Sequence, residues 1–326
     1  MSSKPLSPIQ NPSAVSADQR LPDRRKKNPL LDSIRRYNWL YMFVIPTLLY
    51  VILFHYGPMG GIVIAFKRYT GVKSIWESQW VGLKWFKSFF SSRYAGLTIK
   101  NTIALSLYGL ATFPLPIIMA LIFNEVRNAK YKKFAQTVMY APHFISTVVL
   151  VGMLQLFFNP NYGFVNSAIE FLGGSARDFM TEDESFRHLY VWSGVWQDLG
   201  WNCIIYVAAL SGVDPTLHEA ATLDGASRIQ RILHINLPTI MPTIVIMLIM
   251  RVGHIMSIGA DKVLLMKNDL NSSTAEVIGT YVYSRGLLSG DFSYGTAVGL
   301  FTNVINLIML LIVNSISAKV SDTSLF

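Results

Sequence analysis

Two apolar stretches of the sequence contain side chains suited to binding a polar solute. The first, YVWSGVWQDLGWNCIIYVAAL, covers residues 190–210, and the second, IVIMLIMRVGHIMSIG, covers residues 244–259. At about 100° per residue, a helix over the first stretch brings several polar and aromatic side chains to one side. The predicted residues of a solute pathway there are Gln197, Asp198, Trp201 and Asn202.

This stripe is expected to face protein or water, because an ionised aspartate that faces lipid costs roughly a few kcal/mol. Trp201 beside amides suits a sugar, whose apolar ring face stacks on indole while its hydroxyls need hydrogen-bond partners. In the second stretch, Arg251 and His254 are three residues apart and share a helix face. Arg251 either pairs with Asp198 as a structural tie or clamps a substrate carboxylate. The alternative for the stripe is a hydrogen bond between packed helices.

The chain carries no recognisable catalytic motif or metal-binding pattern. It has no HExxH, no GxSxG and no paired aspartates within its apolar stretches. Its histidines lack metal-ligand spacing, and its single cysteine, Cys203, excludes an intrachain disulfide and a cysteine-based zinc cluster. A GxxxxGK[ST] phosphate loop is also missing. We therefore predict no catalytic residue, no metal site and no cofactor in this chain.

The composition places these stretches in a membrane. Of the 326 residues, 52% are hydrophobic and only 14% are charged, whereas about a quarter are charged in a soluble protein. Several apolar runs reach the roughly 20 residues that a helix needs to cross a bilayer. The predicted fold is an all-α integral membrane protein with six transmembrane helices, the first of them bent near Gly57 and Pro58 and the second kinked at Pro114 and Pro116. The predicted spans lie near residues 39–66, 98–123, 134–158, 188–212, 237–259 and 294–317.

Basic residues determine the expected orientation. Much of the excess positive charge, within a net charge of +9, lies in residues 1–38. We interpret this segment as a disordered cytoplasmic tail, with a nucleic-acid-binding arm as the alternative, and residues 39–326 as one transmembrane domain. No cleavable signal is expected, and six spans place both termini in the cytoplasm. In the outer loop, IWESQWVGLKWFKSFF (75–90) predicts a helix in the lipid headgroup layer.

A soluble-looking segment, residues 214–236, separates the fourth and fifth predicted spans. Asp214 can cap a helix that begins at Pro215, and Gly225 can supply the left-handed turn that ends it. Ser227 then caps a second helix, which Pro238 closes at the start of the next span. We predict an angled helix pair with small residues at its tip, suited to docking into a partner. A loop on the membrane surface is the alternative.

This segment resembles a known family signature. EAATLDGASRIQRILHINLP, from Glu219 to Pro238, is similar to the motif of permease subunits of binding-protein-dependent ABC importers. The matching positions are Glu219, Ala220, Ala221, Gly225, Ile235, Leu237 and Pro238. The segments ALIFNEV, YAPHFIS, GTAVGLF and SDTSLF resemble the branch that imports oligosaccharides. The resemblance covers roughly residues 39–326.

The resemblance implies a type I importer permease in the bacterial cytoplasmic (inner) membrane. In that family the helix pair sits in a cleft of an ATP-hydrolysing subunit, so the seven matching residues are expected to couple to that subunit, with Glu219 pairing with a basic group. The expected partners are a second, related permease, two copies of the ATPase that bind ATP and Mg²⁺, an extracytoplasmic binding protein, an oligosaccharide and membrane lipid, but no nucleic acid.

The nature of the solute is a separate question. Relatives often have an uncharged residue at the position of Arg251, so Arg251 with His254 suggests an acidic sugar such as a uronate oligomer, as in an alginate-type importer. The alternative function is an ion-coupled secondary transporter of a polar solute. Such a transporter usually shows intramembrane carboxylates and an internal repeat, whereas this chain has one clear buried acid, and we find no repeat.

Overall fold

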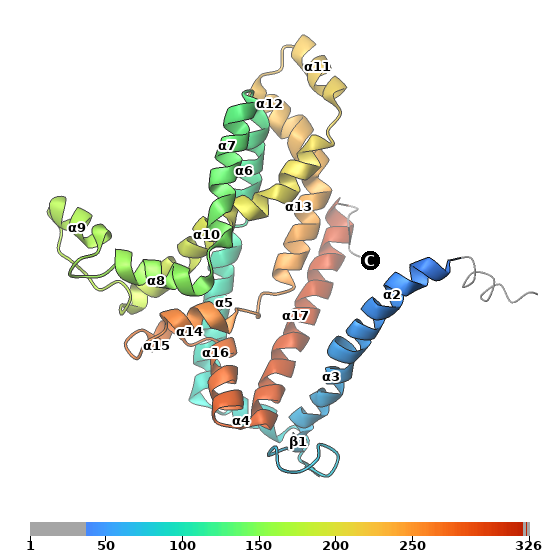
Figure 1. Cartoon of the computed structure of the whole chain (residues 1–326), viewed down its shortest axis with the longest axis vertical. Helices are drawn as coiled ribbons and strands as arrows, with labels where there is room; N and C mark the ends of the chain where they lie inside the picture. Colours follow the sequence, from blue (N-terminus) through green and yellow to red (C-terminus); the bar gives the residue numbers. More distant parts are fainter. Residues whose placement is uncertain (1–36, 322–323, 325–326) are drawn as a thin grey trace, which may run out of the picture. The chain divides into compact units, whose positions relative to one another are not determined.

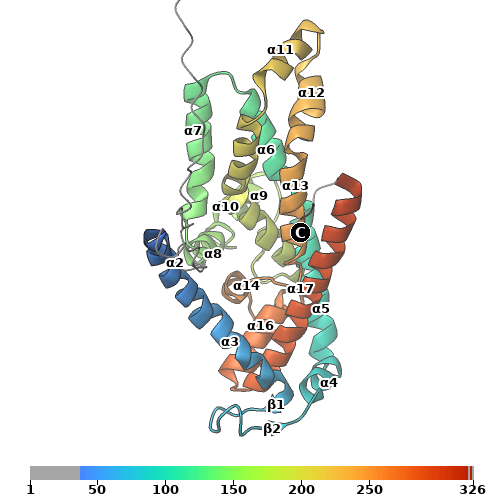
Figure 2. The same ribbon diagram turned by 90° about the vertical axis from the view of Figure 1, so that its right-hand side faces the viewer.

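The computed structural model describes residues 37–321 and residue 324, and it divides the chain after Gly60 into two units (Figures 1 and 2). The first unit contains α2 (Asn38–Val51), the π-helical η1 (Ile52–Tyr56) and α3 (Gly57–Met59). Helix continues through Gly57 and Pro58, but its type changes around them, from α to π and then to 3₁₀ in η2 (Gly60–Phe66). The predicted basic tail, residues 1–38, lies almost wholly outside the described residues.

The second unit is almost entirely helical. Its elements after η2 are β1 (Lys67–Arg68), β2 (Gln79–Trp80), α4 (Lys84–Phe90), α5 (Arg93–Ala111), α6 (Pro114–Glu125), α7 (Ala129–Tyr140), η3 (Ala141–Phe144), α8 (Thr147–Phe157), α9 (Phe164–Phe171), α10 (Asp183–Ser211), α11 (Pro215–Leu223), α12 (Arg228–Arg231), η4 (Ile232–Asn236), α13 (Leu237–Val252), α14 (Ala260–Met266), α15 (Ser272–Ala275), α16 (Ile278–Val282), η5 (Tyr283–Leu288) and α17 (Phe292–Ser321).

Within the described residues, four helical stretches are long and apolar enough to cross a membrane: Trp39–Phe66, Arg93–Glu125, Arg228–Val252 and Phe292–Lys319. They overlap the first, second, fifth and sixth predicted spans, although the fifth ends at Val252 and not near residue 259. The second is interrupted between α5 and α6, where Pro114 and Pro116 predict a kink. The fourth predicted span is α10, a 29-residue helix that is long enough but more polar than the others.

The third predicted span is wrong as a single straight helix. The segment Ala129–Phe144 meets α8 at an angle of 97°. Pro142 lacks an amide hydrogen and lies in the 3₁₀ turn η3. Ser146 then has an extended backbone, and its hydroxyl accepts a hydrogen bond from the Val149 amide, which starts α8 as a separate helix.

Close packing against α10 fixes this bend. A Cβ atom built on the buried Gly200 would lie 2.1 Å from the Met139 carbonyl oxygen, so α10 and α7 touch backbone to backbone. On the neighbouring side, a core cluster that includes Ile117, Ala120, Phe123 and Tyr206 joins α10 to α6. These contacts determine which face of α10 is left uncovered by α6 and α7.

The loop before α5 corrects the prediction for residues 75–90. Only Lys84–Phe90 is helical, while Gln79–Trp80 pairs antiparallel with Lys67–Arg68. The ammonium of the buried Lys67 donates hydrogen bonds to the carbonyls of Ile75 (3.0 Å) and Trp76 (3.1 Å). These carbonyls therefore accept from a side chain and not from the backbone amides of a helix. The amphipathic pattern of residues 75–90 does not predict this.

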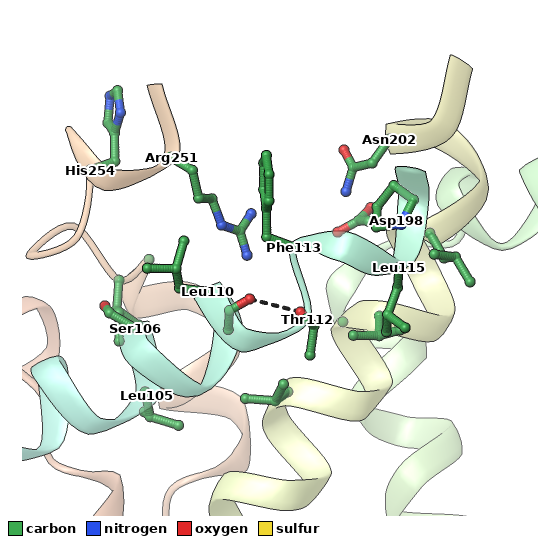
Figure 3. A pocket seen from close by; sticks show the side chains of 18 of the residues that line it. Leu105, Ser106, Leu110, Thr112, Phe113, Leu115, Asp198, Asn202, Arg251 and His254 are labelled. Atoms are coloured by element: carbon green, nitrogen blue, oxygen red, sulfur yellow. Dashed lines mark hydrogen bonds between the residues drawn. The ribbon is translucent and has the colours of Figure 1, made fainter. Parts of the chain in front are cut away.

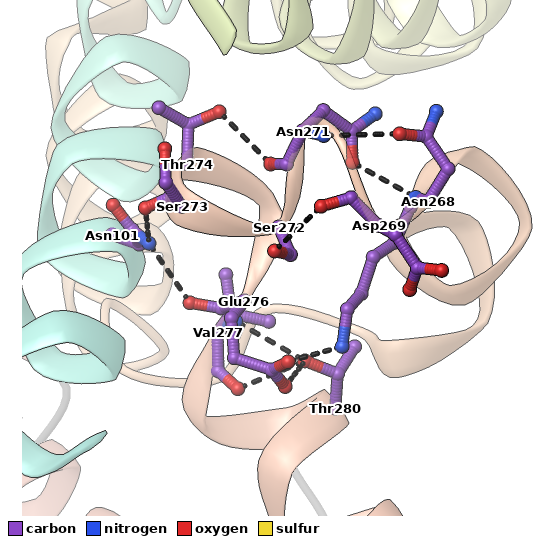
Figure 4. Close-up of polar contacts among 11 residues, drawn as sticks. Asn101, Asn268, Asp269, Asn271, Ser272, Ser273, Thr274, Glu276, Val277 and Thr280 are labelled. Carbon is purple, nitrogen blue, oxygen red and sulfur yellow. Dashed lines mark hydrogen bonds and ion pairs between the residues drawn. The ribbon is translucent and has the colours of Figure 1, made fainter. Parts of the chain in front are cut away.

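A polar network holds the segment from α14 to α16 in place (Figure 4). The Asn101 amide of α5 donates to the carbonyl oxygens of Ser273 (2.9 Å) and Glu276 (3.0 Å). Lys267 forms an ion pair with Glu276, and Asn271 donates to the Met266 carbonyl (3.0 Å). The network therefore fixes the end of α14 against α5.

We expect Gly200→Ala to destabilise the protein, because the added methyl group has to displace backbone atoms of α7. Overpacking of this kind costs about 1–3 kcal/mol. Thermal unfolding of the purified protein should occur at a lower temperature. The matched control is Gly152→Ala on α8, where nothing lies within 4 Å of the new methyl group. Equal unfolding temperatures for the two variants would contradict the described packing.

Candidate functional site

A cavity of about 700 Å³ opens between α5, α6, α10, α13 and α14 (Figure 3). Its volume is in the range of sites that bind small ligands. The polar side chains that line it include Ser106, Thr112, Gln197, Asp198, Asn202 and Arg251. Four of the six predicted pathway residues are in this group, and His254 also lies at the wall. The structure thus brings residues from two separate predicted stretches to one cavity.

Arg251 is the prominent charge in this cavity. Its guanidinium points from α13 toward the middle, with Asp198 and Asn202 of α10 on the other side (Figure 3). It lies beside Gly109 on α5, where a Cβ atom would lie 3.5 Å from Nη2, in ordinary van der Waals contact. Within residues 37–321 no carboxylate lies within ion-pair distance of Arg251. Its donors are available to a ligand.

Of the two alternatives for Arg251, the structure does not form the tie to Asp198, which has another partner. His143 Nδ1 donates to Asp198 Oδ1 at 2.9 Å, so the tie runs to η3 and not to Arg251. The neighbouring Gln197 donates from Nε2 to the Ile145 carbonyl at 2.7 Å. Both side chains therefore satisfy polar groups of the bend, while they also line the cavity. For Gln197 and Asp198, the structure therefore forms hydrogen bonds between packed segments, which is the alternative to a solute pathway.

Trp201 and His254 take positions that differ from the expected ones. Trp201 does not line the cavity; its ring stacks on His143, with centroids 4.3 Å apart and an interplanar angle of 9°. α10 is rotated so that Asp198 and Asn202 face the cavity and Trp201 faces η3. His254 lies beyond the end of α13, where its Nδ1 is 2.9 Å from the Met250 carbonyl oxygen. It points away from Arg251 in Figure 3.

Two residues at this site were missed by sequence reasoning. Lys262, on the short helix α14, lines the cavity, and His143 holds Asp198. Lys262 follows the predicted end of the fifth span, so the sequence places it in a loop. His143 gives only a local signal, its position after Pro142. No periodic pattern connects either residue to α10.

The helix pair of residues 214–236 forms largely as predicted, at the opposite end of the second unit from β1 and α4 (Figures 1 and 2). Asp214 caps α11 by accepting a hydrogen bond from the Thr216 amide, which lowers the pKa of this carboxyl. Gly225 has φ +78°, as a left-handed turn requires. Ser227 and Gln230 form a capping box at the start of α12.

Pro238 does not close the second helix. Helix runs from Arg228 through Val252 without interruption, and the π-helical turn η4 precedes Pro238. A π-turn supplies a different set of carbonyl partners, so the helix can continue past the proline, which has no amide hydrogen. The second arm of the pair is therefore a direct extension of α13.

The seven residues of the signature fall into two groups. Glu219, Ala220 and Gly225 are exposed, and Ala221 is half-buried beside them. Ile235 and Leu237 pack against the core cluster of α6 and α10, next to the exposed Pro238. At the tip, the side chains of Leu223 and Ile229 are 89% and 69% exposed. The tip of the helix pair is thus apolar and exposed, while its base at Ile235 and Leu237 is packed against the core. This arrangement suits contact with another protein.

Comparison with known proteins identifies the family. The family "Binding-protein-dependent transport system inner membrane component" matches residues 112–322. LplB of Bacillus subtilis (strain 168) is 42% identical over 295 residues, covering 90% of this chain and 93% of LplB. The polygalacturonan/rhamnogalacturonan transport system permease protein YteP of the same organism is 40% identical over 314 residues, covering 96% and 98%. This chain belongs to that family of inner membrane transport components.

Solved structures agree with this assignment. A chain of a bacterial alginate ABC transporter, in complex with an alginate pentasaccharide-bound periplasmic protein, superimposes with a TM-score of 0.84 at 37% sequence identity. The match covers 91% of this chain and 99% of the other. A second structure, of an ABC transporter involved in the import of the acidic polysaccharide alginate, gives a TM-score of 0.83.

We predict that Asp198 and His143 are energetically coupled. Either alanine substitution should lower the unfolding temperature, and the double variant should lose less stability than the sum of the two. For directly bonded groups the expected coupling is about 0.5–3 kcal/mol. Thermal unfolding of the four proteins of this cycle measures it. The control cycle replaces His143→Ala with Lys319→Ala, an exposed residue in the last turn of α17, and should be additive. Additivity in both cycles would refute the tie.

Proposed function

We propose that this chain is the membrane-spanning subunit of an ATP-driven importer and forms half of the pathway for an acidic oligosaccharide. The observation that carries the substrate assignment is Arg251, a guanidinium that points into the cavity with no carboxylate beside it in the described residues. A planar guanidinium can donate two parallel hydrogen bonds to a carboxylate. A cation in such a cavity is costly unless a counter-charge arrives, and an acidic solute supplies one.

Similar proteins support the same substrate class. YteP is described as a transport permease for polygalacturonan and rhamnogalacturonan, and one matching structure as part of an importer for alginate. Galacturonan and alginate are both polymers of uronic acids, with one carboxylate on each uronate residue. Two similar proteins are thus described with uronate polymers, and this chain has in its cavity an Arg251 that is unpaired among the described residues. Together these observations favour an acidic over a neutral sugar.

The energy source belongs to other subunits. The chain has no phosphate loop of the GxxxxGK[ST] type, so ATP and Mg²⁺ are proposed to bind to two copies of a separate ATPase. The exposed pair of α11 and α12 docks into that subunit through Glu219, Ala220 and the turn at Gly225. Because α12 continues into α13, which carries Arg251, a displacement of the tip is transmitted as a rigid body to the cavity.

The remaining partners follow from the same assignment. A second, related permease chain completes the pathway on the open side of the cavity, and an extracytoplasmic binding protein delivers the sugar. Both termini and the α11–α12 pair lie in the cytoplasm in this proposal, within the bacterial inner membrane. An ion-coupled secondary transporter has no use for an exposed helix pair with an apolar tip. Transport by this chain alone in liposomes would support that alternative.

Arg251→Gln is expected to remove the preference for acidic sugar. The assay uses the complete assembly in proteoliposomes and two probes, a galacturonate tetramer and its methyl ester, each loaded on the cognate binding protein. Loss of a charge-assisted bond of about 1.5–3 kcal/mol corresponds to roughly 10- to 100-fold. Uptake of the acid should fall by that factor and uptake of the ester by less than about twofold. Equal uptake of acid and ester by the unaltered assembly would overturn the substrate assignment.

Ala220→Trp should prevent docking of the ATPase subunit, because a bulky ring replaces a methyl group on the exposed face of α11. We expect loss of co-purification, with the unfolding temperature of the permease unchanged. His218→Trp is the matched control: two residues away on the same helix, it places the same ring on nearly the opposite side. Full co-purification of the Ala220→Trp variant would contradict the docking surface.

A further inference from the structure

Lys262 is a second cation of the cavity, on a different element from Arg251. It belongs to α14, outside the membrane-spanning helices, and its ammonium reaches across to α10. Nζ donates to the Tyr190 carbonyl oxygen at 2.9 Å and lies 4.8 Å from the centre of the Tyr190 ring. The ammonium sits beside Gly194, where a Cβ atom would lie 3.4 Å from Nζ, in ordinary van der Waals contact.

The charge of Lys262 is not neutralised by its surroundings. Among the described residues no carboxylate lies within ion-pair distance of it. The charge of Asp198 acts on Lys262, but Asp198 accepts its hydrogen bond from His143. An ammonium carries three donors, and the Tyr190 carbonyl takes one of them. The other donors are available to a ligand.

The position of Lys262 is fixed by the network that holds α14. Immediately after α14, Lys267 pairs with Glu276, and the Glu276 carbonyl accepts from Asn101 (Figure 4). Asn271 donates to Met266 in the last turn of the helix. A lysine on a braced helix is a fixed positive charge and not a mobile surface group, which is what a binding site requires.

Arg251 and Lys262 therefore approach one face of α10 from two different elements. Arg251 comes from α13 and Lys262 from α14, and both line the cavity that also contains Tyr190, Gly194 and Asp198 at four-residue intervals along α10. We infer that Lys262 is a second carboxylate-binding residue, so that the cavity selects an oligosaccharide with at least two acidic sugars. This inference rests on the proposed function, and it adds the requirement for more than one acidic sugar.

The inference predicts a dependence on pH. Burial lowers the pKa of Lys262 to about 8, although the charge of Asp198 raises it again in part. The other titratable groups that share the cavity are Tyr190, Tyr206, Arg251 and His254. Below pH 8 the ammonium is charged and binds carboxylate, and above pH 8 this contribution is lost. Uronate carboxylates stay ionised throughout this range.

The test uses the complete assembly in proteoliposomes between pH 7 and pH 9. The measured quantity is the ratio of ATPase stimulation by binding protein loaded with the galacturonate tetramer to stimulation by binding protein loaded with its methyl ester. The ratio cancels the pH dependence of the ATPase itself. In the unaltered protein the ratio should fall as the pH rises through 8. Lys262→Gln should give a ratio lower by roughly tenfold at pH 7, with no further fall at pH 9.

Lys262→Arg separates binding from a structural role. An arginine remains protonated at pH 9. The acid-to-ester ratio of this variant should therefore stay high from pH 7 to pH 9. Lys100→Gln, an exposed lysine that does not line the cavity, should behave as the unaltered protein. A galacturonate monomer, with one carboxylate, should give the same response in Lys262→Gln as in the unaltered assembly.

The outcomes distinguish the inference from the function on which it rests. Suppose that the unaltered assembly strongly prefers the acid and that Lys262→Gln keeps the same preference and the same pH profile. This result would overturn the role of Lys262 but leave the proposed function intact. A ratio near one in the unaltered assembly would overturn the acidic substrate as well. Failure of Lys262→Arg to retain the ratio at pH 9 would also count against the assignment.

Discussion

The bend between η3 and α8 imposes the main constraint on this structure. A helix that breaks inside an apolar bundle exposes backbone groups that lipid cannot satisfy. α10 contributes in two ways: Gln197 donates to the Ile145 carbonyl, and Gly200 allows the backbone of α7 to pack closely. The His143–Asp198 bond adds a charged tie. With one face of α10 fixed in this way, the adjacent face is left to form the cavity.

The cavity then acquires an unbalanced charge. Among the described residues that line it, the one acid, Asp198, is engaged with η3, whereas two cations, Arg251 and Lys262, enter the cavity. In the proposed function, a polyanionic sugar neutralises both charges, and this favours entry of acidic over neutral solutes.

The sequence predicts those features that depend on local chemistry. Caps at Asp214 and Ser227 and the turn at Gly225 involve residues within one or two helical turns, so the local sequence is enough to predict each of them. Span positions follow from length and hydropathy. The right-angled bend after Phe144, the position of Trp201 on His143 and the arrival of Lys262 at α10 depend on contacts between distant segments. Periodicity within one stretch contains no information about them. It leaves open whether Arg251 pairs with Asp198 or with a substrate, and in the structure the partner of Asp198 is His143.

The central claim is that acidic sugar carboxylates bind between Arg251 and Lys262. An experimental structure of the complete assembly, trapped during transport with a uronate tetramer in the membrane, tests it most directly. The account predicts sugar density in the cavity against α10, with one carboxylate within hydrogen-bonding distance of the Arg251 guanidinium and another at the Lys262 ammonium. Density at a different site, or both cations paired with carboxylates of a partner chain while the sugar lies elsewhere, would contradict it.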